Sequence, residues 1–315
     1  MRSSVVICVY TEDRWEDIRQ AVESVENQTR RPHEIILVVD YNPELHLRLK
    51  KEYPGAIVVE NAQEKGLSGG KNTGAQIASG DIVAYLDDDA IAEPGWLEAL
   101  EEGFQDPTIV GVGGLTRPLW GTGHRPGWYP YEFDWTVGCS YRGMPTERAR
   151  IRNVMGGNAA FRREPIGAVG GFHTGIGRSV QGRKPRPLGC EETEFCIRLS
   201  QRMPGSGMLF EPAAVIGHKV PAARATFRYF RSRCYAEGLS KALVTQSVGA
   251  GDGLASERAH ALKALPLGAL RGVGEALRGD VSGLGRAGAI VVGLAWTTWG
   301  YVVGSLRLKK KRGRA

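Results

Sequence analysis

The first ninety residues alternate short apolar runs with longer amphipathic segments, and this alternation constrains the fold more than any other feature. The apolar runs, rich in β-branched residues, cover residues 5–9, 34–39, 56–59 and 82–86. The amphipathic segments between them cover residues 15–27, 44–53 and 68–79. Fully apolar strands alternating with helices predict an α/β fold with a mostly parallel, doubly wound sheet and flanking helices.

Polar residues that follow the apolar runs are the first candidates for a functional site. Ligands of such sheets bind beyond the carboxyl ends of the strands. The residues in those places are 11–14, Asp40 and 87–89. Asp40 alone fits a site residue and the first residue of a turn equally well.

The strongest local signal is three consecutive carboxylates, Asp87, Asp88 and Asp89, at the end of a predicted strand. Like charges this close repel one another unless a cation or hydrogen-bond donors neutralise them. An acidic turn that caps a helix starting near Pro94 is the simpler interpretation. A hard divalent cation that bridges to diphosphate oxygens accounts for more of the pattern.

The segment KGLSGGKNTG at residues 65–74 resembles a phosphate-binding loop without matching the Walker pattern, because Asn72 follows Lys71 and Lys65 stands where the first glycine belongs. Glycines beside a lysine before a helix suit close approach to an anion. An ordinary helix N-terminal loop explains the same residues.

Two further groups depend on context. Glu191, Glu192 and Glu194 open a predicted helix, where the helix dipole alone favours carboxylates. His218 follows a strand-like run, and a lone histidine is more often structural than a ligand.

Taken together, these motifs resemble the family 2 inverting glycosyltransferases with the Rossmann-like GT-A fold, over residues 5–220. The matching features, in the family's order, are the opening strand with its polar turn, Asp40, GLSGGKNTG, LDDDA, and GGNAAFRR…GGF with CEETEF and His218. The resemblance implies a nucleotide-sugar donor, a divalent metal (Mn²⁺ or Mg²⁺) and direct displacement at the anomeric carbon.

The resemblance also implies roles for individual residues. Asp40 would contact a uracil-type base, Asp87 the ribose or the metal, and Asp89 and His218 the metal. Glu192 occupies the place of the catalytic base in CEETEF, where relatives have GEDxEF, and Glu191 precedes it. The remaining expected contacts are Thr11, Lys71 and Asp88 to the donor and Gly157, Asn158 and Trp135 to the acceptor.

A narrower resemblance is to the glucosyl-dolichyl-phosphate glucuronosyltransferases of this family. It is carried by PGWYPYEFDWTVGCSYRGMP, RNVMGGN and RYFRSRCYAEGLSKALV. It implies transfer of glucuronic acid from a UDP donor to a saccharide linked to polyprenyl or dolichyl phosphate. The alternative is another sugar in exopolysaccharide or cell-wall assembly. Arginines that could pair with an acidic sugar or a lipid phosphate, or simply be solvated, are Arg162, Arg163, Arg178 and Arg183.

The C-terminal third differs in charge from the rest. Residues 1–218 have a net charge of −5 (24 basic against 29 acidic), and residues 219–315 have +12 (17 against 5). The uncharged run at residues 287–306 is long enough, as a helix of about 30 Å, to cross a bilayer. Basic residues beside an apolar run favour anionic lipid headgroups over nucleic acid.

A single crossing would put the basic tail at 309–314 opposite a cytosolic catalytic domain, against the positive-inside tendency. We therefore expect an interfacial or re-entrant pair of helices at residues 259–277 and 287–306. The domains expected are a catalytic domain at 1–220, a basic amphipathic helix region at 221–248 and membrane-associated helices at 249–315. Five scattered cysteines indicate a reducing compartment, and so the cytoplasmic face of the cell membrane.

Overall fold

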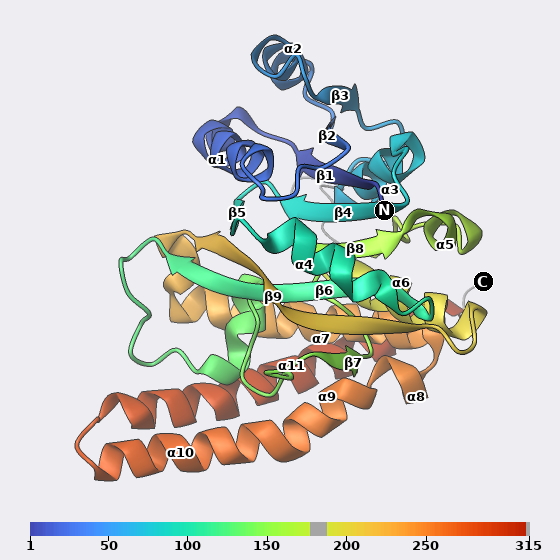
Figure 1. Cartoon of the computed structure of the whole chain (residues 1–315). Helices are drawn as coiled ribbons and strands as arrows, with labels where there is room; N and C mark the ends of the chain where they lie inside the picture. Colours follow the sequence, from blue (N-terminus) through green and yellow to red (C-terminus); the bar gives the residue numbers. More distant parts are fainter. Residues whose placement is uncertain (177–187, 313–315) are drawn as a thin grey trace. The chain divides into compact units, whose positions relative to one another are not determined.

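The structure is a computed structural model that describes residues 1–176 and 188–312 (Figure 1). It consists of two compact units. The first contains Met1–Arg117, Pro145–Arg186 and Glu191–His218, and the second contains Pro118–Met144, Pro187–Cys190 and Lys219–Ala315. The aromatic segment Pro118–Met144 is part of the second unit, together with the C-terminal helices.

Nine strands of the described residues form one mixed sheet, in the order β3-β2-β1-β4-β8-β6-β9-β5, with β7 paired to β9. The strands are β1 (Ser3–Val9), β2 (Glu34–Val39), β3 (Ile57–Glu60), β4 (Ile82–Asp87), β5 (Ala90–Ala92), β6 (Ile109–Trp120), β7 (Ala149–Ile151), β8 (Asn158–Arg162) and β9 (Gly207–Val220). The first four strands pair in parallel, as the alternation predicts. The later strands add antiparallel pairs.

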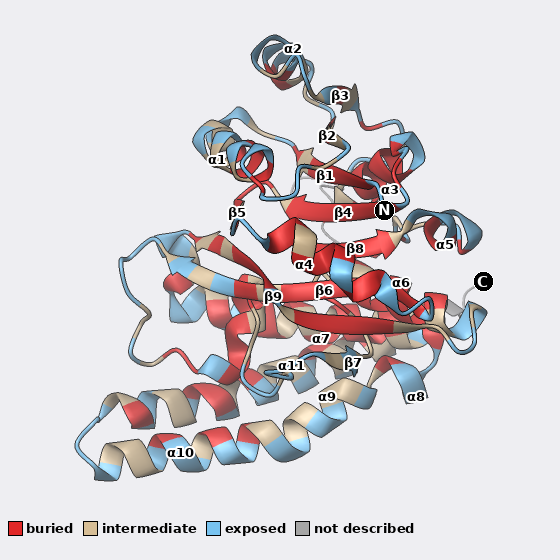
Figure 2. Cartoon of the chain, in the orientation of Figure 1, coloured by how far each residue is buried: buried red, intermediate tan, exposed pale blue. Residues whose placement is uncertain are grey.

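Helices flank this sheet. They are α1 (Trp15–Glu26), α2 (Pro43–Glu52), α3 (Leu67–Ile77), α4 (Trp96–Glu102), α5 (Arg163–Ala168) and α6 (Glu191–Arg202), with short 3₁₀ turns η1 (Glu12–Arg14) and η2 (Gly103–Gln105). Strands β1 and β4 are buried along nearly their whole length, because helices cover both of their faces (Figure 2). This burial explains why their sequences are continuously apolar rather than alternating.

The parallel registers bring the carboxyl ends of the central strands to one edge. Val9 of β1 lies opposite Val39 of β2, and Cys8 lies opposite Asp87 of β4. Strand β5 follows β4 after a two-residue turn and pairs antiparallel with β9, with Ala90 opposite His218. These pairings bring the polar residues after β1, β2 and β4, and the end of β9, to the same edge of the sheet.

The second unit is mainly helical. Its elements are η3 (Tyr131–Val137), η4 (Ala222–Ala225), α7 (Phe227–Val248), α8 (Ala250–Gly253), α9 (Ala255–Ala259), the π-helical η5 (His260–Ala264), α10 (Leu265–Leu277) and α11 (Ser282–Arg312). The Gly-rich stretch after α7 forms the short helices α8 and α9. The aromatic segment adds Tyr129 and Phe133 to a buried cluster with Phe230 of α7.

Helices α7 and α11 pack closely at glycines. A Cβ on Gly238 of α7 would overlap the backbone of α11 at Thr297, and one on Gly300 of α11 would overlap the Tyr235 carbonyl of α7. Gly300 and Gly304 of α11 therefore allow this helix to pack closely against α7 within the second unit. By length and composition, Ser282–Lys310 could cross a membrane, and 28% of its most apolar window is buried.

Candidate active site

Asp40 is held at the carboxyl edge of the sheet by hydrogen bonds from both sides. Its N–H donates to the Val9 carbonyl at 2.7 Å. Its Oδ1 accepts from Asn61 Nδ2 at 2.7 Å and from the Gly66 N–H at 3.1 Å. The carboxylate is thus fixed by the loops that follow β3 and precede α3.

Asp87, Asp89 and His218 form one compact group of potential metal ligands. One ligand atom from each lies within 4.8 Å of the others, and His218 Nε2 is 3.2 Å from Asp89 Oδ1. Asp89 and His218 are buried, whereas Asp87 is partly exposed. Two carboxylate oxygens and an imidazole nitrogen suit a divalent cation such as Mn²⁺. The donor set in this chain therefore fits the metal that the sequence resemblance implies.

The Asp88 carboxylate pairs with Arg14 and is not part of the metal-ligand group. Arg14 Nη1 donates to Asp88 Oδ1 at 2.5 Å and lies 3.1 Å from Asp89 Oδ2. Burial raises the pKa of Asp88 to about 7, Arg14 opposes the rise, and the neighbouring carboxylates of Asp89 and Asp87 add to it. The buried Asp88 Oδ2 has no hydrogen-bond partner among the described residues. Arg14 thus offsets the repulsion between two of the three adjacent carboxylates, Asp88 and Asp89.

Thr11 has a local structural role. Its hydroxyl accepts the Asp13 N–H at 3.3 Å and thereby caps η1, the turn that carries Arg14. The expected contact of Thr11 with the donor stays a prediction.

Two adjacent glycines lie between the metal-ligand group and the glutamates of α6. A Cβ on Gly157 would overlap the Asp87 carboxylate. A Cβ on Gly156 would lie 2.7 Å from Lys71 Nζ and 3.4 Å from the Glu192 side chain. Since neighbouring Cα atoms are about 3.8 Å apart, Asp87 and Glu192 flank the same dipeptide.

The three glutamates of α6 have different surroundings. Glu191 is buried and accepts from Lys71 Nζ at 3.4 Å. Glu194 is fully buried and pairs with Arg198 at 2.8 Å. Glu192 is the most exposed of the three, as expected for a group that meets a substrate.

Lys71 is itself buried, which disfavours its charged form, but the carboxylates of Glu191, Asp87 and Glu192 outweigh burial and raise its pKa. The raised pKa favours the charged form of Lys71, whose ammonium contacts Glu191 of α6.

Asn158 does not fit the expected contact with an acceptor. It is fully buried, its Oδ1 accepts from Trp96 Nε1 at 2.7 Å, and its Nδ2 donates to the carbonyls of Leu115 and Ala214. All of these bonds are internal, so the side chain holds strands together rather than facing a ligand. Trp135 belongs to the second unit, where its ring packs against Phe133.

The four arginines considered as partners of an acidic sugar or a lipid phosphate fall into two groups. Arg162 donates to the carbonyls of Ile109 and Phe104, and Arg163 donates to that of Gly80. Both therefore stabilise the fold. Arg178 and Arg183 lie outside the described residues.

Two site residues had no clear signal in the sequence. Arg14 lies in the polar turn at residues 11–14, but its partners Asp88 and Asp89 are far along the chain. An ion pair between such distant residues cannot be predicted from sequence spacing. Gly156 stands in the MGGN run, but nothing there indicates that a side chain at this position would crowd the Lys71 ammonium.

Comparisons with known proteins identify the family. The family model described as "Glycosyl transferase family 2" matches residues 4–170. A glucosyl-dolichyl phosphate glucuronosyltransferase from Haloferax volcanii is 34% identical over 245 residues, which cover 76% of each protein.

Two solved structures resemble the chain. A mannosyltransferase from Pyrobaculum calidifontis, in complex with GDP-Man and Mn²⁺, has a TM-score of 0.57 at 19% identity and covers 95% of this chain and 87% of its own. GalNAc-T7 with UDP, GalNAc and Mn²⁺ has a TM-score of 0.53 at 23% identity; the match covers 77% of this chain, which spans about half (51%) of GalNAc-T7. At these identities the likeness shows the fold alone, and it confirms the expected fold class.

Proposed function

The chain belongs to glycosyl transferase family 2, and from that premise we propose that it transfers glucuronic acid from a UDP donor to a saccharide linked to polyprenyl or dolichyl phosphate. The observation that carries the chemistry is the Gly156–Gly157 dipeptide, with Asp87 against one glycine and Glu192 against the other. A cation site and a candidate base would thus flank the same two glycines.

Asp87, Asp89 and His218 would hold a divalent cation, and both structural neighbours contain Mn²⁺. A bound cation supplies charge neutralisation for the departing diphosphate. Arg14 keeps Asp88 and the far oxygen of Asp89 in place. Asp40, fixed by Asn61 and Gly66, would accept hydrogen bonds from the nucleobase.

Glu192 is the proposed base. It takes the proton of the acceptor hydroxyl as the hydroxyl oxygen forms its bond to the anomeric carbon and the bond from that carbon to the diphosphate breaks. One displacement of this kind inverts the anomeric configuration. Glu191, held by Lys71, positions the start of α6 rather than taking the proton.

The narrow substrate assignment is supported by the 34% identity to the glucuronosyltransferase. Of the predicted acceptor contacts, the backbone at Gly157 and the ring of Trp135 remain part of the proposal, and the side chain of Asn158 does not.

We place the enzyme at the cytoplasmic face of the membrane, with α10 and α11 in the interface rather than across it. Exposed apolar side chains along these helices support this placement; they are Leu267, Leu270, Leu277, Leu284, Val291 and Leu306. The close packing of α11 on α7 also supports it, because α7 carries the charged pairs Arg233–Glu237 and Lys241–Glu237.

A donor panel tests the proposal. UDP-glucuronate, UDP-glucose, UDP-GalNAc and GDP-mannose are offered with Mn²⁺, with and without a polyprenyl-phosphate-linked glucose acceptor, and released nucleotide and product anomer are measured. Acceptor-stimulated turnover with inversion and a preference for UDP-glucuronate is expected. Faster turnover of a neutral donor would overturn the sugar assignment and leave the alternative of another glycan, while no turnover of any donor would overturn the function.

A further inference from the structure

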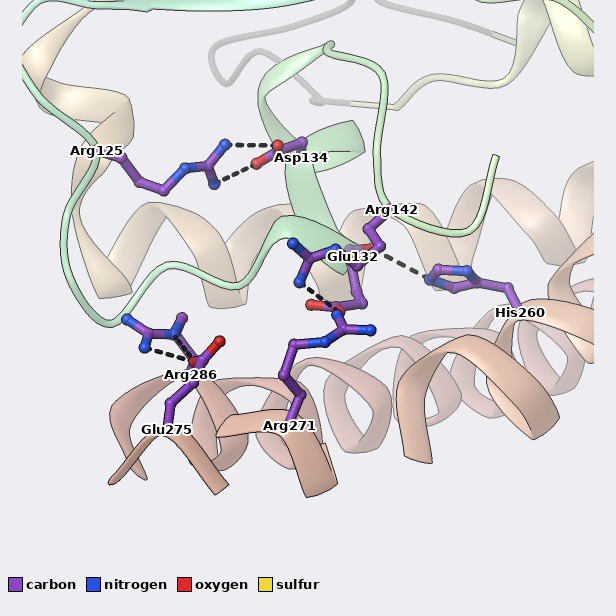
Figure 3. A network of polar contacts seen from close by, with 8 residues as sticks. All are labelled: Arg125, Glu132, Asp134, Arg142, His260, Arg271, Glu275 and Arg286. Atoms are coloured by element: carbon purple, nitrogen blue, oxygen red, sulfur yellow. Dashed lines mark hydrogen bonds and ion pairs between the residues drawn. The ribbon is translucent and has the colours of Figure 1, made fainter. Parts of the chain in front are cut away.

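A buried carboxylate in the second unit is shared by two half-exposed arginines from distant segments (Figure 3). Glu132 of η3 is 3% exposed, and its Oε1 lies 3.5 Å from Arg142 Nη1 and 3.2 Å from Arg271 Nη1 of α10. Each arginine side chain is 43% exposed. One carboxylate balances one of the two positive charges, so an excess positive charge remains on guanidinium edges that face solvent.

The position of Arg142 is fixed by an aromatic ring and by its backbone. Its guanidinium lies over the Tyr131 ring at 4.6 Å, and its N–H donates to the Tyr131 carbonyl at 3.0 Å. Arg125 stacks on the same ring at 3.9 Å, while both of its terminal nitrogens bind Asp134. Arg125 is therefore neutralised and supports the ring, and Arg142 carries the available charge.

Arg271 is brought to the same carboxylate by close packing of its helix. A Cβ on Gly268, one turn earlier in α10, would lie 2.6 Å from Glu132 Oε1. His260 Nε2, just before α10, donates to the Glu132 carbonyl at 3.1 Å. Both arginines are thus held in place before any ligand arrives, which reduces the entropy lost on binding.

Apolar side chains lie next to this basic pair on α10. Leu270, the neighbour of Arg271, is 69% exposed, and Leu267 is 60% exposed. A fixed pair of guanidiniums beside exposed leucines matches an amphiphile with an anionic head and a hydrocarbon chain. Among the described residues, the acidic side chain that binds the pair is Glu132 alone.

We propose that Arg142 and Arg271 bind the phosphate of a polyprenyl-phosphate lipid, with its hydrocarbon chain along Leu267 and Leu270 of α10. The proposal rests on the lipid-linked acceptor of the proposed function. Its test contains no sugar donor and measures no transfer, so the two can fail separately.

The test is direct binding to the full-length protein in detergent micelles, by calorimetry, with farnesyl phosphate as the probe and farnesol as its uncharged match. Arg142→Gln and Arg271→Gln should each weaken farnesyl phosphate binding about tenfold, the size of one charge-assisted hydrogen bond. Arg278→Gln removes an exposed arginine from the end of the same helix and should stay within twofold. Farnesol should bind wild type at least tenfold more weakly than its phosphate.

Glu132→Gln should change farnesyl phosphate binding in the opposite direction to the arginine variants. Removing the competing carboxylate should tighten farnesyl phosphate binding several-fold, whereas arginines that serve only to neutralise Glu132 predict no gain. If Arg271→Gln lowers the Tm strongly, Arg271→Lys, which keeps the charge and loses the planar fork, should still weaken binding.

Three results would overturn the proposal: unchanged binding in both arginine variants, equal binding of farnesol, or full competition by phosphatidylglycerol vesicles. The last result would make the surface a general contact for anionic membranes.

Discussion

His218 Nε2 lies 3.2 Å from Asp89 Oδ1 because β9 pairs with β5, which places His218 opposite Ala90. The metal-ligand group therefore depends on strand pairing as much as on the acidic run itself. A histidine that reads as isolated in the sequence becomes part of a site through one antiparallel register.

The first prediction concerns Asp89. Asp89→Ala should reduce transfer at least about a hundredfold and weaken Mn²⁺ binding, because it removes one of the potential ligands. Turnover and Mn²⁺ titration by electron paramagnetic resonance measure the two effects. Glu44→Ala, which removes an exposed carboxylate on α2, is the control. Full activity of Asp89→Ala in the presence of a chelator would contradict the metal assignment.

The second prediction separates two adjacent glutamates. Glu192→Gln should slow the chemical step at least about a hundredfold while donor binding persists, as expected for loss of a general base. Glu191→Gln should slow it less but lower the Tm more, because it leaves the buried Lys71 without its carboxylate partner. Single-turnover kinetics and thermal unfolding are the measurements. If the two orders are reversed, the base is Glu191.

The third prediction concerns Cys190, a non-glycine residue with φ of +73°. Its thiol lies 3.0 Å from Glu237 Oε1, and both Cys190→Gly and Cys190→Ala lose that contact. Glycine adopts positive φ without steric cost, so Cys190→Gly should be more stable than Cys190→Ala by about 1 kcal/mol. Urea unfolding of the two variants tests this. A more stable alanine variant would refute left-handed strain at this position.

The fourth prediction is a pH dependence of stability in the second unit. Burial lowers the pKa of His260 below its usual value, although the Glu132 carbonyl and the Glu132 and Glu257 carboxylates oppose this. The Tyr141 ring packs edge-on against the His260 ring. The unfolded chain thus binds a proton more readily, so stability should fall as pH drops through about 6.5.

His260→Gln keeps a donor for the Glu132 carbonyl and cannot take up the proton. Its Tm should therefore change less than that of wild type between pH 8 and pH 5.5. Equal Tm changes in the two proteins would assign the pH dependence to other groups.

The fifth prediction tests the interfacial placement of α10 and α11. Leu277, at the end of α10, is 85% exposed, so Leu277→Asp should leave the Tm unchanged but weaken sedimentation with anionic vesicles several-fold. Leu47→Asp, at a 68% exposed leucine on α2, is the matched control. A C-terminal reporter should be inaccessible from outside sealed cells. Labelling of that reporter only from outside would show that α11 crosses the membrane.

The sequence predicted the N-terminal half of the fold closely, because each strand there is a continuous apolar run and each helix is amphipathic. Strands β1, β2 and β4 begin and end within two residues of the expected runs. The ends of the later strands β6 and β9 were harder to predict, since these strands extend across segments of mixed composition. The burial of the aromatic segment Pro118–Met144 depends on partners in α7 that local sequence does not reveal.

For the site, the acidic run and Asp40 were predicted from their positions after strands and from the resemblance, and Glu192 from the resemblance alone. The structure adds what holds them in place. Arg14 on Asp88, Lys71 on Glu191 and Asn61 on Asp40 are pairings between distant segments, which sequence spacing cannot predict.

Gly156, Gly157 and Asn158 stand next to one another and resist substitution for three unrelated reasons. The first two leave room for Lys71 and Asp87, and the third ties Trp96, Leu115 and Ala214 together. A saturation mutagenesis scan should find all three positions intolerant, although none of these reasons requires contact with a substrate. Mutational intolerance along MGGN is therefore a measure of how the site is built, and it cannot by itself identify which residues the sugar touches.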